Sequence, residues 1–294
     1  KGYTGDARPA IFAARPAPIQ VNYLGFPGTM GSNCYDYILA DRIVIPESHK
    51  PHYDERVVYL PHSYLPHDSL RAIAEDRPSR ADCGLPDKGF VFCCFNAAYK
   101  IGPAMFDVWM RLLNGVEGSV LWLSAAPADT VRNLRSEALA RGVSGERLVF
   151  APFVPTNERH LARLAHADLF LDTLPYNAHS TAIDALWMGL PVVTCLGGSF
   201  AGRVGASLLQ AAGLPELITG TPEDYERLAL SLARDPARLS SLKARLSENR
   251  NTAPLFDTRG FTRHLEAAYA AMQARHVRGM APENFAVDPA TAAP

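Results

Sequence analysis

The chain has 294 residues, of which 48 % are hydrophobic, and a formal net charge of −1 from 29 basic and 30 acidic side chains. This composition predicts one large or two ordinary folded domains and excludes the strong positive charge typical of nucleic-acid-binding or membrane-surface proteins. Since the sequence shows neither a run of ~20 apolar residues nor the apolar core of a signal peptide, we expect a soluble cytoplasmic protein with a small polar partner, and neither nucleic acid nor membrane.

The first eighty residues contain short apolar runs separated by segments rich in Gly, Pro and Asn, with no long amphipathic helix. These runs are Ile19–Leu24, Tyr35–Leu39 and Val57–Leu60. Lys1–Asp6 offers neither an initiator Met nor a helix cap, which indicates a chain that starts inside a larger protein. We expect residues 1–80 to form part of one domain, with its boundary near Arg71–Gly84.

Residues 81–278 alternate short apolar runs with amphipathic stretches, the pattern of βαβ units and a parallel sheet in an α/β fold. The predicted strands are Phe90–Phe95, Ser119–Leu123, Arg147–Phe150, Asp168–Leu171 and Pro191–Thr194. The predicted helices are Pro103–Leu113, Ala128–Arg141, Asn157–His166, Ser180–Met188, Ala201–Ala212, Pro222–Arg234, Pro236–Arg250 and Thr258–Arg275. The tail 279–294 is rich in Ala and Pro, and we expect it to be loose.

Several common site motifs are missing from the sequence. Its five cysteines form no C-x-x-C pair, which argues against a disulfide framework or a zinc site. There is no G-x-G-x-x-G and no P-loop sequence, and no Asp-x-Asp pair follows a predicted strand. The sequence therefore predicts no metal site and no dinucleotide cofactor.

Two loops that follow predicted strands carry polar side chains. Asn96 and Lys100 follow the strand at Phe90–Phe95. Residues 172–181 lead from the strand at Asp168–Leu171 into a helix that carries Asp184. Ligands of open parallel sheets bind outside the carboxyl ends of the strands. We therefore expect both loops to line one ligand site.

The start of the helix at Ser180 is suited to an anion, because its first turn offers free N–H groups and the positive end of the helix dipole. Ser180 and Thr181 add hydroxyl groups, and His179 adds a ring donor. Asp184, one turn further, can accept hydrogen bonds from a ribose. From these residues alone, a helix cap at Ser180 with Asp184 favouring the dipole is an equally good interpretation.

A third loop, 151–160, joins a strand to the next helix, and its backbone is suited to a flat base edge. His160 and Arg163 share one face of that helix, although such a pair more often lies on the surface. An isolated Lys100 would likewise more often be an ordinary solvated lysine.

These motifs together resemble the catalytic region of the O-GlcNAc transferase family, and the likeness covers nearly the whole chain. The matching segments are Arg15–Val21, Leu24–Gly31, Lys100 after a strand, His160-x-x-Arg163, Leu171–Thr173, Asn177–Trp187 with Asp184, Gly189–Thr194 and Pro254–Thr258. The alanine-rich composition favours a bacterial member.

The resemblance implies a GT-B glycosyltransferase that moves N-acetylglucosamine from UDP-GlcNAc to Ser or Thr hydroxyls of proteins, with inversion and without a metal. It implies a partial N-terminal catalytic lobe in residues 1–80 and a complete C-terminal Rossmann-like lobe, which binds the UDP-sugar, in residues 81–278. The family's tetratricopeptide repeats and proposed base histidines would lie upstream.

The resemblance also implies roles for individual residues. Lys100 is the catalytic residue, which contacts the diphosphate. The other UDP-sugar-binding positions are Asn96, Val154, Asn157, His160, Arg163, His179, Ser180, Thr181, Asp184, Gly25, Phe26 and Pro27. The chain departs from the family pattern at Ala97, at Asn157 and at Tyr176, which stands at the N-acetyl pocket. A GT-B transferase with another UDP-sugar or a non-protein acceptor, and a non-catalytic UDP-sugar-binding module, are the alternatives.

Overall fold

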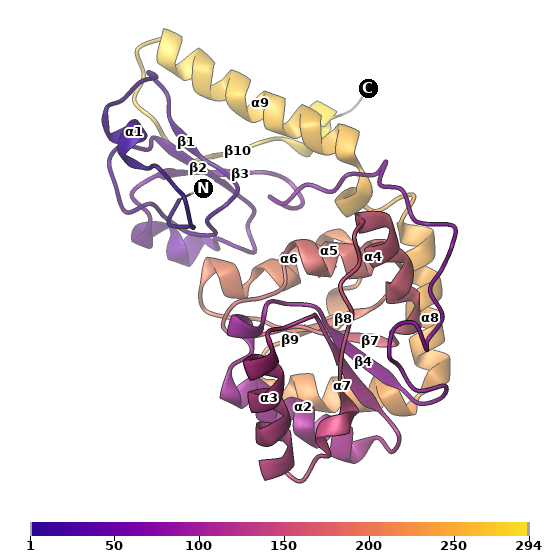
Figure 1. The fold of residues 1–294 in the computed structure, drawn as a ribbon. Helices are drawn as coiled ribbons and strands as arrows, with labels where there is room; N and C mark the ends of the chain where they lie inside the picture. Colours follow the sequence, from indigo (N-terminus) through magenta and orange to yellow (C-terminus); the bar gives the residue numbers. More distant parts are fainter. Residues whose placement is uncertain (1, 293–294) are drawn as a thin grey trace.

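The structure, a computed structural model, describes residues 2–292. They form two sheets of parallel strands, and Figure 1 shows the first sheet above the second with helices α5 and α6 between them. The first sheet has the strand order β1-β2-β3-β10, and the second has the order β6-β5-β4-β7-β8-β9. Every strand pair is parallel. This arrangement confirms the predicted α/β class with parallel sheets.

The first sheet is small and is built from the predicted runs of the N-terminal region. Its strands are β1 (Val21–Asn22), β2 (Tyr37–Ala40), β3 (Arg56–Tyr59) and β10 (Phe285–Ala286). The short helices α1 (Ala10–Ala13) and η1 (Glu47–His52) flank these strands.

The expectation of a loose tail is wrong at β10, which extends this sheet beside β3. The Val287 N–H donates to the carbonyl of Tyr59 at 2.9 Å, and the Phe285 ring packs edge-on against Tyr37. A two-residue strand surrounded by Ala and Pro has too little periodicity to be recognised in the sequence.

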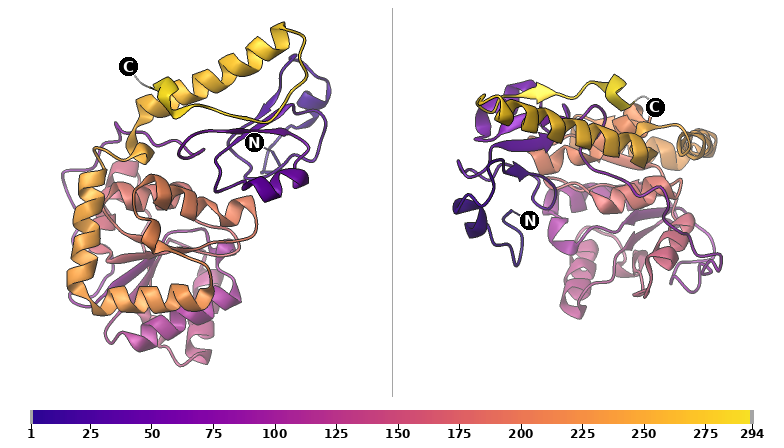
Figure 2. Two further views of the ribbon diagram at one scale, coloured as in Figure 1. Left: turned by 180° about the vertical axis from the view of Figure 1, so that it is seen from behind. Right: turned by 90° about the horizontal axis from the view of Figure 1, so that it is seen from above.

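The long helix α9 (Thr258–Val277) packs on the first sheet, although the sequence-based division had assigned it to the second domain. Its residues Ala268 and Met272 share a buried cluster with Tyr37 and Val58. Both Figure 1 and the left view of Figure 2 show α9 lying along this sheet. The chain therefore returns to its first sheet after completing the second.

The second sheet confirms the predicted alternation of strands and helices. Its strands are β4 (Val91–Cys94), β5 (Val120–Leu123), β6 (Leu148–Phe150), β7 (Leu169–Leu171), β8 (Val192–Cys195) and β9 (Ile218–Thr219). Its helices are α2 (Pro103–Gly115), α3 (Ala128–Ala140), α4 (Asn157–Arg163), α5 (Ser180–Trp187), α6 (Val204–Ala211), α7 (Pro222–Arg234) and α8 (Pro236–Asn249). Short 3-10 turns precede several of the elements, among them η2 (Ala98–Lys100), η5 (Phe200–Gly202) and η7 (Pro254–Phe256).

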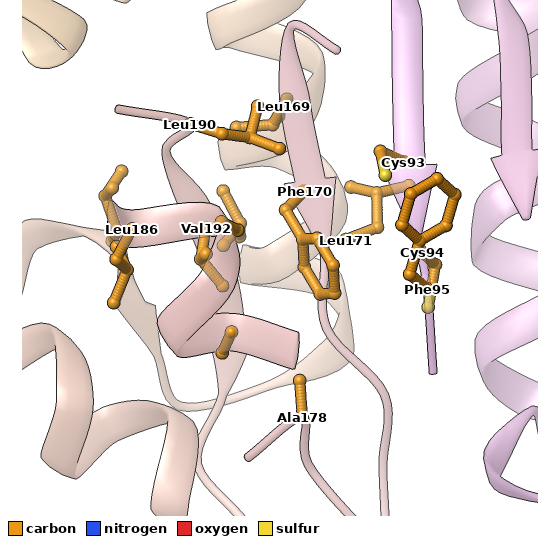
Figure 3. Packing of buried hydrophobic residues seen from close by; sticks show 14 of the residues in the cluster. Cys93, Cys94, Phe95, Leu169, Phe170, Leu171, Ala178, Leu186, Leu190 and Val192 are labelled. Carbon is orange, nitrogen blue, oxygen red and sulfur yellow. The ribbon is translucent and has the colours of Figure 1, made fainter. Parts of the chain in front are cut away.

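The core of the second sheet fixes the place of β4, β7 and α5. Helices α4, α5 and α6 cover one face of the sheet, and α2, α3 and α7 cover the other (Figure 1). Phe170 and Leu171 of β7 pack between Cys93 of β4 and Val192 of β8, and all four side chains are fully buried (Figure 3). Because the strands are apolar on both faces, polar groups are left to the loops at their ends.

Candidate functional site at the strand-order switch

The candidate site lies where the strand order of the second sheet reverses. The chain runs outward through β4, β5 and β6, then returns to the other side of β4 with β7. The loops after β4 and β7 therefore leave the same sheet edge in opposite directions, and in open α/β sheets the crevice that binds a ligand forms at such a point. These are the two loops that the sequence predicts as the ligand site.

Asp172, at the end of β7, organises the second loop from inside. Its Oδ1 accepts from the N–H groups of Thr173 at 2.8 Å and Ala178 at 2.5 Å, and its Oδ2 accepts from Thr194 Oγ1 at 2.6 Å. Asp172 is only 1 % exposed, and this burial raises the pKa of its carboxyl to about 6. The sequence places Asp172 at the start of the predicted ligand loop and gives no sign of this role.

Gly205 of α6 leaves the space that this carboxylate occupies. A Cβ at Gly205 would meet Asp172 Oδ2 and would lie 2.6 Å from Thr194 Oγ1. Gly205→Ala should therefore lower the free energy of unfolding by about 2 kcal/mol, because a buried polar network must shift. Thermal and urea unfolding measure this loss, and Gly220→Ala, with no atom within 4 Å of its Cβ, is the matched control. Equal stability of the two variants would contradict the prediction.

Asn96 joins the two loops to each other. Its Nδ2 donates to Thr173 Oγ1 at 2.7 Å, and its Oδ1 accepts from Thr181 Oγ1 at 2.6 Å. Asn96 is 1 % exposed. Its side chain therefore holds the two loops together. Asn96 is placed to position the loops and not to contact a ligand itself.

Lys100 reaches across the crevice to the second loop. Its Nζ donates to the carbonyl of Asn177 at 2.9 Å and lies 4.0 Å from the centre of the Tyr176 ring. Burial lowers the pKa of Lys100 to about 8, and nearby Asp172 partly offsets this shift. Lys100 is therefore not an ordinary solvated lysine, which is what the residue considered alone would predict.

His179 stands at the entrance to α5. Its ring stacks on Tyr176 with centroids 4.9 Å apart, and its Nε2 lies 3.3 Å from the carbonyl of Ala201. Burial lowers the pKa of His179 to about 4, so the ring is neutral at pH 7.

Helix α5 begins at Ser180, with His179 in the capping position. Among the described residues no side chain caps this helix. The interpretation of Ser180 as the cap is therefore wrong. The crevice instead receives an uncapped helix start beside an ammonium group, which suits an anion.

One turn into α5, Asp184 lies in a chain of polar side chains. Arg71 Nη1 is 2.5 Å from Asp184 Oδ1, and His160 Nε2 is 3.6 Å from Asp184 Oδ2. Arg163 Nη2 lies 2.7 Å from His160 Nδ1. Because a guanidinium only donates, His160 Nδ1 accepts and its proton sits on Nε2, facing Asp184.

Arg163 is not a surface residue, as it is 7 % exposed. Its Nη1 donates to the carbonyl of Pro152 at 2.7 Å, and its guanidinium lies 4.8 Å from the Phe95 ring. Arg163 therefore fixes both His160 and the start of the loop after β6. On that loop, Val154 is half-buried and Asn157 is exposed at the first turn of α4.

A cavity of about 430 Å³ lies between the two sheets. Phe26 and Pro27 line it, while the adjacent Gly25 is exposed with φ 97°. Opposite them stands the segment 198–200 after β8, which the sequence did not single out. This segment adjoins the second loop, because the carbonyl of Ala201 accepts from the N–H of Asn177 at 2.9 Å.

No helix in residues 2–292 is long and apolar enough to cross a bilayer. No group of three or more His, Cys, Asp or Glu side chains within the same residues is placed to hold a metal ion.

Comparison with known proteins gives consistent matches. A family model described as glycosyl transferase family 41 matches residues 1–76 and 76–265. The chain is 39 % identical over 292 residues to a probable UDP-N-acetylglucosamine–peptide N-acetylglucosaminyltransferase of Arabidopsis thaliana, covering 97 % of this chain and 30 % of that protein. A similarly named Caenorhabditis elegans protein is 28 % identical, with 95 % of this chain and 34 % of that protein covered. The chain thus spans about a third of the length of these relatives.

Comparison with solved structures supports the same family and shows the fold. The chain is similar to a mutant O-GlcNAc transferase of Thermobaculum terrenum, with a TM-score of 0.81, 36 % identity, and coverage of 91 % of this chain and 51 % of that one. A sucrose-phosphate synthase of Thermosynechococcus elongatus shares the fold, with a TM-score of 0.57, 18 % identity, and 82 % and 59 % of the two chains covered. These likenesses confirm the predicted GT-B fold. With the family model matching most of its length, the chain belongs to glycosyl transferase family 41.

Proposed function

We infer that this chain carries the donor site of a protein O-GlcNAc transferase, which moves N-acetylglucosamine from UDP-GlcNAc to Ser or Thr hydroxyls of an acceptor protein. The relatives named above support this substrate pair. One observation carries the proposal: Lys100 and the uncapped start of α5 converge at the strand-order switch. We further propose a cytoplasmic protein of bacterial origin, which its alanine-rich composition favours, with the family's tetratricopeptide repeats upstream.

In this proposal each side of the crevice binds one part of the donor. Lys100 and the N-terminal turn of α5, with His179, Ser180 and Thr181, bind the diphosphate and sugar. Asp184 binds the ribose, His160 lies against the nucleotide, and the stretch from Val154 to Asn157 faces uracil. Gly25, Phe26 and Pro27 border the sugar from the first sheet. Asn96 and Arg163 hold these groups in place.

The proposed reaction is direct displacement without a metal. The acceptor hydroxyl oxygen attacks the anomeric carbon from the face opposite UDP, so the configuration inverts, and the bond to the diphosphate oxygen breaks. The acceptor hydroxyl gives its proton to a base, which the family resemblance places upstream, and negative charge grows on the departing UDP. The ammonium of Lys100 and the positive end of the α5 dipole stabilise that charge, and they contribute most in the transition state.

A panel of nucleotide sugars tests the donor. UDP-GlcNAc and UDP should raise the unfolding temperature of this chain more than GDP-sugars do, because a ligand at a hundred times its Kd stabilises by about 2.7 kcal/mol. Transfer to Ser- and Thr-containing peptides, followed by mass spectrometry, tests the reaction. Selective stabilisation by a different UDP-sugar would favour another GT-B activity. Binding without any transfer in the full-length protein would favour the binding module.

The pKa of Lys100 predicts a pH dependence. Only the protonated amine carries the charge that this mechanism uses, and its pKa in the free protein is about 8. The kcat/KM for UDP-GlcNAc should therefore fall about tenfold per unit above that pH. Initial rates measured from pH 6 to 9.5 check this, with the fold followed by circular dichroism. A flat profile up to pH 9.5 would remove the charge of Lys100 from the mechanism.

A further inference from the structure

The connector that links the two sheets passes directly over the nucleoside end of the proposed donor site. It leaves β3, and its residues 67–71 lie along one face of α5. The His67 ring packs on Trp187 with centroids 4.3 Å apart, and four residues further Arg71 meets Asp184. Asp184 and Trp187 are three apart on α5, so they share a face.

Independent contacts fix the connector in this place. The N–H of Ser69 donates to Thr258 Oγ1 at 3.0 Å, and Thr258 Oγ1 lies 2.7 Å from the carbonyl of His67. Beyond Arg71, the N–H of Ala74 donates to the carbonyl of Glu158 in α4 at 3.3 Å. The connector therefore spans both helices that carry the predicted nucleoside-binding side chains, and Arg71 lies between its two anchors.

The geometry leaves both members of the Arg71–Asp184 pair partly free. The Arg71 and Asp184 side chains are 17 % and 12 % exposed, so the pair is shielded but still reaches solvent. Within residues 2–292, the Arg71 guanidinium uses one nitrogen on Asp184 and forms no other hydrogen bond. Asp184 Oδ2 lies beyond hydrogen-bond distance of His160. Unused N–H donors and an unused carboxylate lone pair thus stand side by side.

Such a donor–acceptor pair fits a vicinal diol. One ribose hydroxyl donates its hydrogen to Asp184 Oδ2, while its oxygen, or that of its neighbour, accepts from the Arg71 guanidinium. An arginine fork suits this better than a lysine would, because its planar donors are held at fixed angles. A deoxyribose, or a sugar without adjacent hydroxyls, would leave the Arg71 N–H donors or the Asp184 carboxylate without a hydrogen-bond partner.

We propose that Arg71 is a ribose-recognition residue of the donor site, supplied by the connector between the sheets, and that it selects ribonucleotide over deoxyribonucleotide diphosphates together with Asp184. This rests on the proposed function, since it presumes that the crevice binds a uridine diphosphate. Sequence patterns gave no sign of Arg71, which is 113 residues from Asp184.

Calorimetric binding of UDP and of 2′,3′-dideoxy-UDP to this chain tests the proposal. The wild type should prefer UDP by tenfold or more, as expected when a site built for a hydroxyl meets an analogue lacking it. Arg71→Ala should weaken UDP binding by about tenfold and reduce the preference to under about threefold. Arg71→Lys keeps the charge but not the fork and should also lose most of the preference. Arg132→Ala, whose pair with Asp129 is exposed, is the matched control and should bind both like the wild type.

The preference ratio separates recognition from support of the fold. If Arg71→Ala weakens both nucleotides equally, or binds UDP like the wild type, Arg71 does not recognise ribose and the proposal is overturned. If Arg71→Ala does not fold by circular dichroism, the ratio measured with Arg71→Lys decides in the same way. A wild-type chain that binds no UDP at all overturns the donor site itself, which is a different result.

Discussion

Replacing Lys100 with alanine should lower turnover by about a hundredfold or more while the fold survives. The ammonium lies close to the start of α5, where the proposed mechanism has charge accumulate on the departing diphosphate. Removing one donor aimed at such charge typically costs ~3 kcal/mol of transition-state stabilisation. Because this contact strengthens as the bond breaks, kcat and kcat/KM should fall together. Steady-state transfer rates to a peptide acceptor measure both.

Two further variants define what Lys100 does. Lys88→Ala removes a lysine that is exposed ahead of β4 and should leave turnover unchanged. Lys100→Arg keeps a positive charge of different shape and should recover part of the rate. Turnover of Lys100→Ala equal to that of the wild type would exclude Lys100 from the mechanism. A loss seen only in KM would assign it to ground-state binding.

Replacing Asp172 with alanine should destabilise the protein by about 3 kcal/mol and abolish donor binding. Its carboxylate accepts from two backbone N–H groups and from Thr194, and all three would be left buried without a partner. The loop from Thr173 to Ala178, which positions the Lys100 contact on Asn177, would lose its inner support. Urea unfolding and calorimetry with UDP measure the two effects.

Asp172→Asn is the matched variant, because its amide oxygen can still accept from both backbone N–H groups. The two proteins should also differ with pH. The folded pKa of Asp172, about 6, lies above its ordinary value of 3.8. The stability that protonated Asp172 contributes is therefore fully present below pH 3.8 and is lost as the pH rises through 6. The advantage of wild type over Asp172→Asn should shrink from pH 4 to pH 7, and a constant difference would contradict the raised pKa.

The strands and helices of the second sheet could be predicted because the sequence patterns that indicate them lie within each element. The apolar run of β4, the Pro at the first turn of α2 and the polar loop ahead of α5 are each visible within a dozen residues. The convergence of Asn96, Lys100 and Thr181 followed from one rule about where parallel strands end. The identity of the proposed ligand rests on the family resemblance, because no pattern of periodicity supplies it.

What the sequence concealed depends on contacts between distant segments. Arg71 meets Asp184 only because the connector lies along α5, and α9 packs on a sheet formed more than two hundred residues earlier. Asp172 looked like any polar residue at the end of a strand, since its partners Ala178 and Thr194 come together only in the fold. These positions differ from ordinary polar residues in their burial and in their hydrogen-bond partners, and not in residue type.

Within residues 2–292 the chain passes between the two sheets twice, at residues 60–90 and at residues 250–258, and Thr258 ties the passages together through Ser69. Connecting segments of this kind are where two lobes of a protein commonly hinge when they close around a ligand. Bending there would change the spacing of Phe26 and Phe200 across the cavity between the sheets. Lys100 and Asp184 both belong to the second sheet and would keep their separation. The width of the proposed site beside the sugar would therefore change, while the distance between the proposed diphosphate and ribose contacts Lys100 and Asp184 would not.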